Sequence, residues 1–212
     1  MGQRFQSVFI LPEIYINEGN CNNKNKRVLV YHNQWLYGFS AIRDNLEVMK
    51  RIKEAYNNNK KSKLFNTKKD FINFHLEQFL ELNLDYVILK PNELRSRFHK
   101  SYEFDFKDFK HLGIELSKED NNNGFFICEI TEDLNFKYSF ISGLEDENIV
   151  KPKDPKEYFN LFYKEKDLSK KDIKELNKII NNYLKFEGLL LKDVLEITKE
   201  INNNKPKWAI TE

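Results

Sequence analysis

Side chains that could bind a ligand follow directly after an apolar segment near the amino terminus. The segment 28–31 reads Val-Leu-Val-Tyr, and His32, Asn33, Gln34 and Trp35 come next. Histidine can act as a general base near neutral pH, the two amides can orient a ligand, and tryptophan offers a stacking surface. Because binding residues favour loops at strand ends, this is the best candidate site. The alternative is that Trp35 belongs to the core and His32 bonds a backbone carbonyl.

Arg4 is conspicuous because the chain has 29 lysines and only 6 arginines. It lies in a segment, 3–11, that has the composition of a strand, so we expect it to be partly buried. A buried guanidinium needs an acidic partner or an anion. The favoured interpretation is a structural ion pair with Asp120 or Glu129, and an anion clamp is the alternative.

The predicted site therefore has one candidate catalytic residue and six candidate ligand-binding residues. The candidate catalytic residue is His32, and the ligand-binding candidates are Gln3, Arg4, Gln34, Trp35, Tyr37 and Asp120. We expect no metal and no cofactor. No His/Cys spacing fits zinc, a calcium loop through Asp120 would have Ile130 where its bidentate Glu belongs, and there is no P-loop, Rossmann fingerprint or nucleophile elbow.

Charge and cysteine content restrict the partners and the compartment. The formal net charge is +2, which gives no global basic field for nucleic acid. A basic and aromatic stretch at 95–102 could hold a single strand, but neighbouring acids dilute it, so nucleic acid is only weakly supported. Two distant cysteines suit a reducing cytosol. No apolar run reaches the ~18 residues of a membrane span, so no membrane partner is expected.

The spacing of apolar residues predicts an α+β fold. Segments 3–11 and 27–32 are predicted to pair as an antiparallel hairpin, which would bring residues 2–4 close to residues 32–35. Helices are expected over 40–56 and 68–83, and a short strand over 86–89.

Strict alternation before residue 141 predicts a second hairpin over 124–141, and helices fill the last third. We expect an antiparallel sheet of about four to five strands with helices on one face. We expect residues 1–212 to form a single domain; a sub-boundary near 143–154, with 155–212 as a helical extension, is the alternative.

Three segments together resemble a group of tailed-bacteriophage proteins without an assigned activity. The resemblance rests on Met-Gly-Gln-Arg at residues 1–4, His-Asn-Gln-Trp-Leu-Tyr-Gly at 32–38, and the Asp/Asn-rich turn 120–124 before a hairpin. It implies a phage or prophage origin and a place in the host cytosol, with virion association left open. It also groups the three segments as one motif set, which we expect to converge.

The favoured function is a phage accessory protein that binds a small polar or anionic ligand or a host protein. One alternative is a hydrolase or transferase that uses His32 as general base, Arg4 as anion clamp and Asp120 or Glu129 as partner. The other is a structural or cargo protein of the virion.

Overall fold

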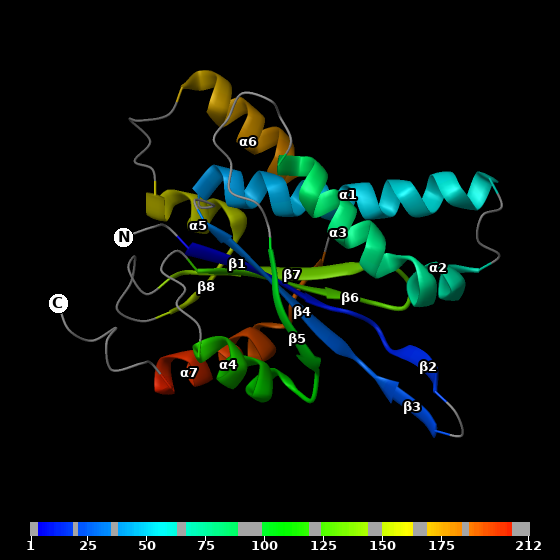
Figure 1. Cartoon of the computed structure of the whole chain (residues 1–212). Helices are drawn as coiled ribbons and strands as arrows, with labels where there is room; N and C mark the ends of the chain where they lie inside the picture. Colours follow the sequence, from blue (N-terminus) through cyan, green and yellow to red (C-terminus); the bar gives the residue numbers. More distant parts are fainter. Residues whose placement is uncertain are drawn as a thin grey trace.

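The chain forms a mixed sheet between two layers of helices (Figure 1). The computed structural model describes residues 4–18, 21–34, 38–62, 67–88, 99–118, 124–143, 150–162, 169–183 and 187–204. The strands are β1 (Arg4–Ile10), β2 (Ile14–Glu18), β3 (Cys21–Asn25), β4 (Arg27–Gln34), β5 (His99–Asp105), β6 (Phe125–Ile130), β7 (Phe136–Ile141), β8 (Pro152–Lys153) and β9 (Glu187–Gly188). The helices are α1 (Gly38–Ser62), α2 (Lys68–Phe74), α3 (Leu76–Ile88), α4 (Phe109–Ser117), α5 (Pro155–Phe162), α6 (Lys170–Tyr183) and α7 (Leu191–Asn203).

The main sheet has seven strands, in the order β5-β4-β1-β6-β7-β8, with β9 also beside β7. The α+β class is confirmed, and the strand count is higher than expected. The sheet is mixed, whereas an antiparallel sheet was expected, because β1 pairs in parallel with β6 and β7 with β9. The parallel pairing of β1 with β6 follows from the connection between β5 and β6, which passes through α4. Parallel strands need a crossover connection of this kind and cannot be joined by a tight turn.

The central strand β1 is apolar on both faces, and this decides the layering. Phe5 and Phe9 belong to one buried cluster with side chains of α1, α2, α3 and α5. Val8 and Ile10 belong to a second cluster with side chains of α4 and α7. The expectation of helices on one face was therefore wrong. A strand that is apolar on both faces must be covered twice, and Figure 1 shows α4 and α7 on the side opposite α1.

The two predicted hairpins are confirmed in position. Arg4 pairs with Gln34 across β1 and β4, and Phe125 pairs with Ile141 across β6 and β7. The predicted strand over 86–89 was wrong, because α3 continues to Ile88. A short apolar run fits a helix end as well as a strand. The segment between β1 and β4 contains a separate hairpin, β2–β3.

The carboxyl-terminal third is helical, as expected, and it contributes to both cores. Tyr158 of α5 is buried in the first cluster, and Val194 of α7 is buried in the second. Helix α7 approaches α4 closely at Gly113, where a Cβ atom would lie 2.7 Å from the Ile197 carbonyl oxygen. In the part of the chain that the structure describes, no helix is both long and apolar enough to cross a membrane.

Candidate functional site

The described parts of the three motif segments meet at one end of the sheet, which we call the Arg4 end. Arg4 of β1 pairs with Gln34 of β4, and Gln6 pairs with His32. The backbone N–H of Gln6 donates to the Gly124 carbonyl oxygen at 3.2 Å. In Figure 1 this is the end of the sheet near the label of the amino terminus. The hairpin and the parallel pairing of β1 with β6 together produce the convergence.

Gly124 is required where the third segment enters β6. Its φ is +98°, a backbone conformation that residues other than glycine rarely adopt. A Cβ atom there would lie only 2.0 Å from the Ile141 carbonyl oxygen. The backbone can therefore bring this segment beside Gln6 only because position 124 carries no side chain.

Gln6 is the most unusual residue at the Arg4 end. It is 0% exposed, and it shares the face of β1 that carries Val8 and Ile10. Neither its Nε2 nor its Oε1 has a hydrogen-bond partner among the described residues. A buried polar group without a partner costs about 1–3 kcal/mol. Such a group calls for an explanation, and a water, ion or ligand that completes its hydrogen bonds is the usual one.

His32 lies next to Gln6 on the neighbouring strand. It is half-buried, and its register partners are Gln6 on β1 and His99 on β5. Glu129 cannot serve it as a partner, because Glu129 is level with Ile10 on β1. That is four residues, or about 13 Å, along the strand from the Gln6 level.

Glu129 is not the partner of Arg4 either. Its carboxylate accepts from Lys26 Nζ at 2.8 Å. Arg4 lies six residues from Ile10, about 20 Å along β1. The expected ion pair between Arg4 and Glu129 is therefore wrong. The other expected partner, Asp120, lies outside the described residues.

The remaining predicted site residues are described only in part. Gln3, Trp35, Tyr37 and Asp120 lie outside the described residues. The backbones of Arg4 and Gln34 lie in β1 and β4, but their side chains are outside the described part. Of the seven predicted side chains, the structure thus places His32.

On the other face of the same end, polar side chains are buried between β1 and α1. Ser7 Oγ donates to Asn45 Oδ1 at 2.7 Å, and Asn45 Nδ2 donates to the Ala41 carbonyl oxygen at 2.8 Å. The next residue back along α1, Asp44, is 2% exposed and accepts from Arg43 Nε at 2.7 Å. The Ser7–Asn45 bond thus joins β1 to α1 on this face, and the other two bonds lie within α1.

Sequence reasoning missed Gln6, Ser7 and Asn45, although a signal for the first two was present. Phe5 and Phe9 flank Ser7 in one alternating series of β1, and Gln6 begins the other series before Val8. A polar residue at an apolar position of a strand indicates either that the predicted register is wrong or that the polar side chain has a function there.

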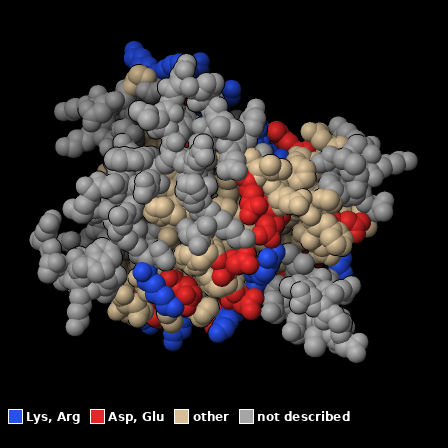
Figure 2. All heavy atoms as spheres, in the orientation of Figure 1, with Lys and Arg blue, Asp and Glu red and all other residues tan. Residues whose placement is uncertain are grey.

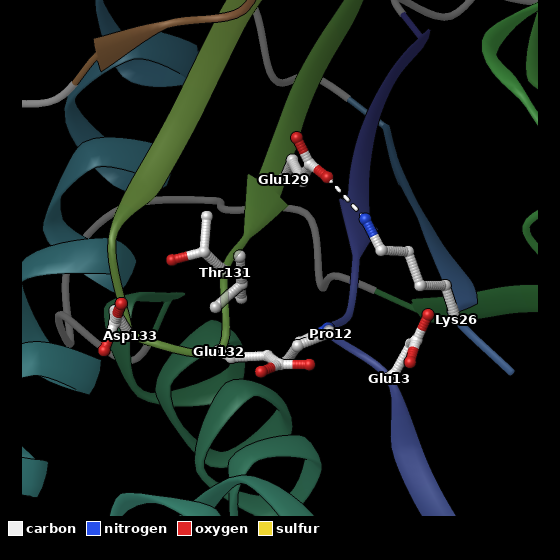
Figure 3. A pocket seen from close by; sticks show the side chains of 8 residues that line it. Pro12, Glu13, Lys26, Glu129, Thr131, Glu132 and Asp133 are labelled. Carbon is white, nitrogen blue, oxygen red and sulfur yellow. Dashed lines mark hydrogen bonds and ion pairs between the residues drawn. The ribbon is translucent and has the colours of Figure 1, made fainter. Parts of the chain in front are cut away.

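A hollow lies at the end of the sheet opposite the Arg4 end. It has a volume of about 340 Å³, and Figure 3 shows Glu13, Glu129, Glu132 and Asp133 around it with Lys26. Two of these acids are already paired, Glu129 with Lys26 and Asp133 with Lys68. Among the described residues, no group of three or more His, Cys, Asp or Glu is placed to hold a metal ion.

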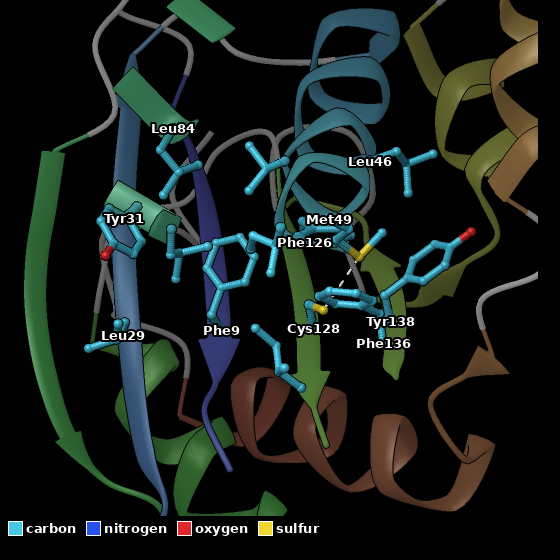
Figure 4. Close-up of a cluster of buried hydrophobic side chains, with 14 of the residues drawn as sticks. Phe9, Leu29, Tyr31, Leu46, Met49, Leu84, Phe126, Cys128, Phe136 and Tyr138 are labelled. Carbon is cyan, nitrogen blue, oxygen red and sulfur yellow. Dashed lines mark hydrogen bonds between the residues drawn. The ribbon is translucent and has the colours of Figure 1, made fainter. Parts of the chain in front are cut away.

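Cys128 of β6 is a core residue of the first buried cluster. It is fully buried, and its Sγ donates to Met49 Sδ at 3.5 Å beneath α1 (Figure 4). Burial, and then the charge of Glu129, raise the pKa of the thiol well above its usual range. A thiol that stays protonated is a poor nucleophile, so Cys128 offers no covalent chemistry.

Acidic and basic side chains are intermixed on the face of the molecule that Figure 2 shows, among the described residues. Some charges of opposite sign are paired with one another: Arg27 contacts Glu77 at 2.7 Å and Glu103 at 3.8 Å. Residues 95–98 of the basic and aromatic stretch lie outside the described residues.

No family model matches the chain, and neither a curated protein nor a solved structure matches it. The functional argument therefore depends on the geometry of the Arg4 end.

Proposed function

We propose that the protein is a binding module for a small polar ligand, and that Gln6 and His32 contact this ligand at the Arg4 end of the sheet. The fully buried Gln6 amide, with no hydrogen-bond partner among the described residues, is the observation that supports the proposal. A methionine of similar volume would fill the same space without an unpaired polar group. Proteins accept such a loss of stability at sites that serve function.

The chemistry of Gln6 indicates the class of ligand. A glutamine side chain offers an acceptor oxygen and a donor NH₂ group side by side. Its complement is a molecule with an adjacent donor and acceptor, such as a carboxamide, a lactam or the edge of a nucleobase. Glutamine pairs with adenine in this two-bond manner. His32, on the neighbouring strand, can add a further hydrogen bond or, when protonated, attract an anionic group of the ligand.

The enzyme alternative, in which His32 is the general base, keeps only one of its two expected carboxylate partners. Asp120 lies outside the described residues. Glu129 is excluded by its place at the other end of the sheet. The resemblance to phage proteins makes a phage accessory protein in the host cytosol the setting that we propose for this binding.

A thermal-shift panel tests the proposal, because a ligand that binds the native state raises its stability by mass action. The probes are adenine, uracil, AMP, nicotinamide and free glutamine. The proteins are wild type, Gln6→Met and the matched surface control Gln78→Met, whose side chain is exposed on α3. At least one probe should raise the melting temperature of wild type and of Gln78→Met but not of Gln6→Met. An equal shift in Gln6→Met, or no shift in any protein with any probe, contradicts the proposal.

A further inference from the structure

Three exposed leucines form one apolar surface at the start of α7, which we call the leucine face. Leu190, Leu191 and Leu195 are 55%, 64% and 49% exposed. Leu191 and Leu195 are four residues apart, so they lie on one side of the helix. Val194 and Ile197 of the same helix are buried in the second cluster, and the leucine face is an exposed surface that borders this buried side of α7.

A hollow of about 340 Å³ adjoins the leucine face. It lies where β8 and β9 flank β7, beside the starts of α5 and α7. Its lining combines apolar side chains, among them Tyr138, Leu189 and Leu191, with three charged ones, Lys153, Asp154 and Glu157. A Cβ atom on Gly188, which also lines it, would have no other atom within 4 Å. The projecting leucines and a partly apolar hollow thus occur on the same surface.

Two charged residues flank the leucines. Lys192 and Glu196 are exposed on α7, and neither forms an ion pair with another described residue. Both charges are thus available to an external partner that carries the opposite charges in the same arrangement. A second copy of this chain is such a partner, because its own Glu196 and Lys192 carry those opposite charges.

We propose that α7 is the interface of a symmetric homodimer. A two-fold axis level with residue 193 sets two α7 helices antiparallel and places Leu191 of one copy opposite Leu195 of the other. With a rise of 1.5 Å per residue, Lys192 then lies about 3 Å along the axis from Glu196 of the second copy, and the symmetry makes this ion pair twice. The projecting leucines of each copy meet the hollow of the other. Such a surface is self-complementary, as a two-fold interface must be.

Sedimentation velocity over a concentration series tests the dimer directly. The interface is small, so the series should reach about 300 µM. Wild type should approach twice the mass of the chain. Leu195→Glu should remain monomeric with an unchanged circular dichroism spectrum, because the side chain is exposed. Leu82→Glu is the matched control, since Leu82 on α3 is 64% exposed; it should dimerise as wild type does. The proposal is overturned if wild type stays monomeric over the whole concentration series, or if Leu195→Glu dimerises as wild type does.

A charge exchange tests the arrangement within the dimer. Lys192→Glu and Glu196→Lys each bring like charges together across the two-fold axis, and each should raise the dimer dissociation constant several-fold. The double variant restores opposite charges and should recover most of the affinity. Melting temperatures of the monomers, measured at low concentration, separate this effect from repulsion within one helix. A double variant that dimerises no better than the single variants overturns the antiparallel arrangement.

Discussion

Gln6 of β1 lies directly opposite His32 of β4, at the point where the backbone N–H of Gln6 also bonds the Gly124 carbonyl oxygen at 3.2 Å. Three segments that are distant in the sequence thus share one end of the sheet. Gln6 occupies the position that an apolar residue would fill in an ordinary strand, and its amide atoms have no partner among the described residues. This relationship underlies the proposed ligand site and the predictions that follow.

Replacement of Gly124 by alanine should destabilise the protein by about 2–4 kcal/mol. The positive φ and the Ile141 carbonyl oxygen both oppose a Cβ atom at this position. Urea unfolding measures the change. Gly188→Ala is the matched control, because that Cβ meets open space, and its free energy of unfolding should stay within about 0.5 kcal/mol of wild type. Equal stability of the two variants would contradict the tight approach at Gly124.

Tyr138 should make stability depend on pH in the alkaline range. Burial, followed by the charges of Cys128 and Asp154, raises the pKa of its phenol to about 12 from 10. The native state therefore holds this proton more tightly than the unfolded state. The stabilisation is complete below pH 10 and is lost as the pH rises toward 12, by at most about 1.4 kcal/mol per pH unit.

The comparison with Tyr138→Phe isolates this effect from other groups that titrate in the same range. Free energies of unfolding at pH 9, 10 and 11 would be measured for both proteins. The difference between them should shrink or reverse in favour of Tyr138→Phe as the pH rises. A difference that is constant over this range would show that the phenol is not perturbed by folding.

Cys128 should react with thiol reagents only when the protein opens. Its side chain is fully buried and its raised pKa keeps it protonated, so the native state offers no thiolate. A Cys21→Ser variant leaves Cys128 as the only thiol, and labelling by iodoacetamide then follows the unfolding equilibrium. The labelling rate should rise steeply with urea. A native rate equal to that of a free thiol is the opposite result and would place Cys128 at the surface.

Local patterns predicted the elements well, because alternation and helical spacing act within each segment. The β1–β4 hairpin followed from two apolar runs near the amino terminus, and its register put Arg4 beside Gln34 as expected. The parallel pairing of β1 with β6 was not predictable in this way, because it depends on the path of α4 across the sheet. The second layer of helices, α4 and α7, was not predictable for the same reason.

The candidate site was predicted in its location more than in its residues. His32 and the convergence of the segments came from the sequence. Gln6 did not: the alternation of β1 puts a polar residue at an apolar position, but it does not show whether that side chain will be buried without a partner. The burial of Gln6 depends on the packing of α4 and α7 over its face of β1.

The most direct measurement is the free energy of unfolding of ligand-free wild type, Gln6→Met and Gln78→Met. If Gln6 is retained for a ligand, removal of its unpaired amide should stabilise the ligand-free protein by about 1–3 kcal/mol, while the surface control changes by less than about 0.5 kcal/mol. A Gln6→Met variant that is less stable than wild type would mean that the amide already serves the fold, and it would contradict the proposed ligand site.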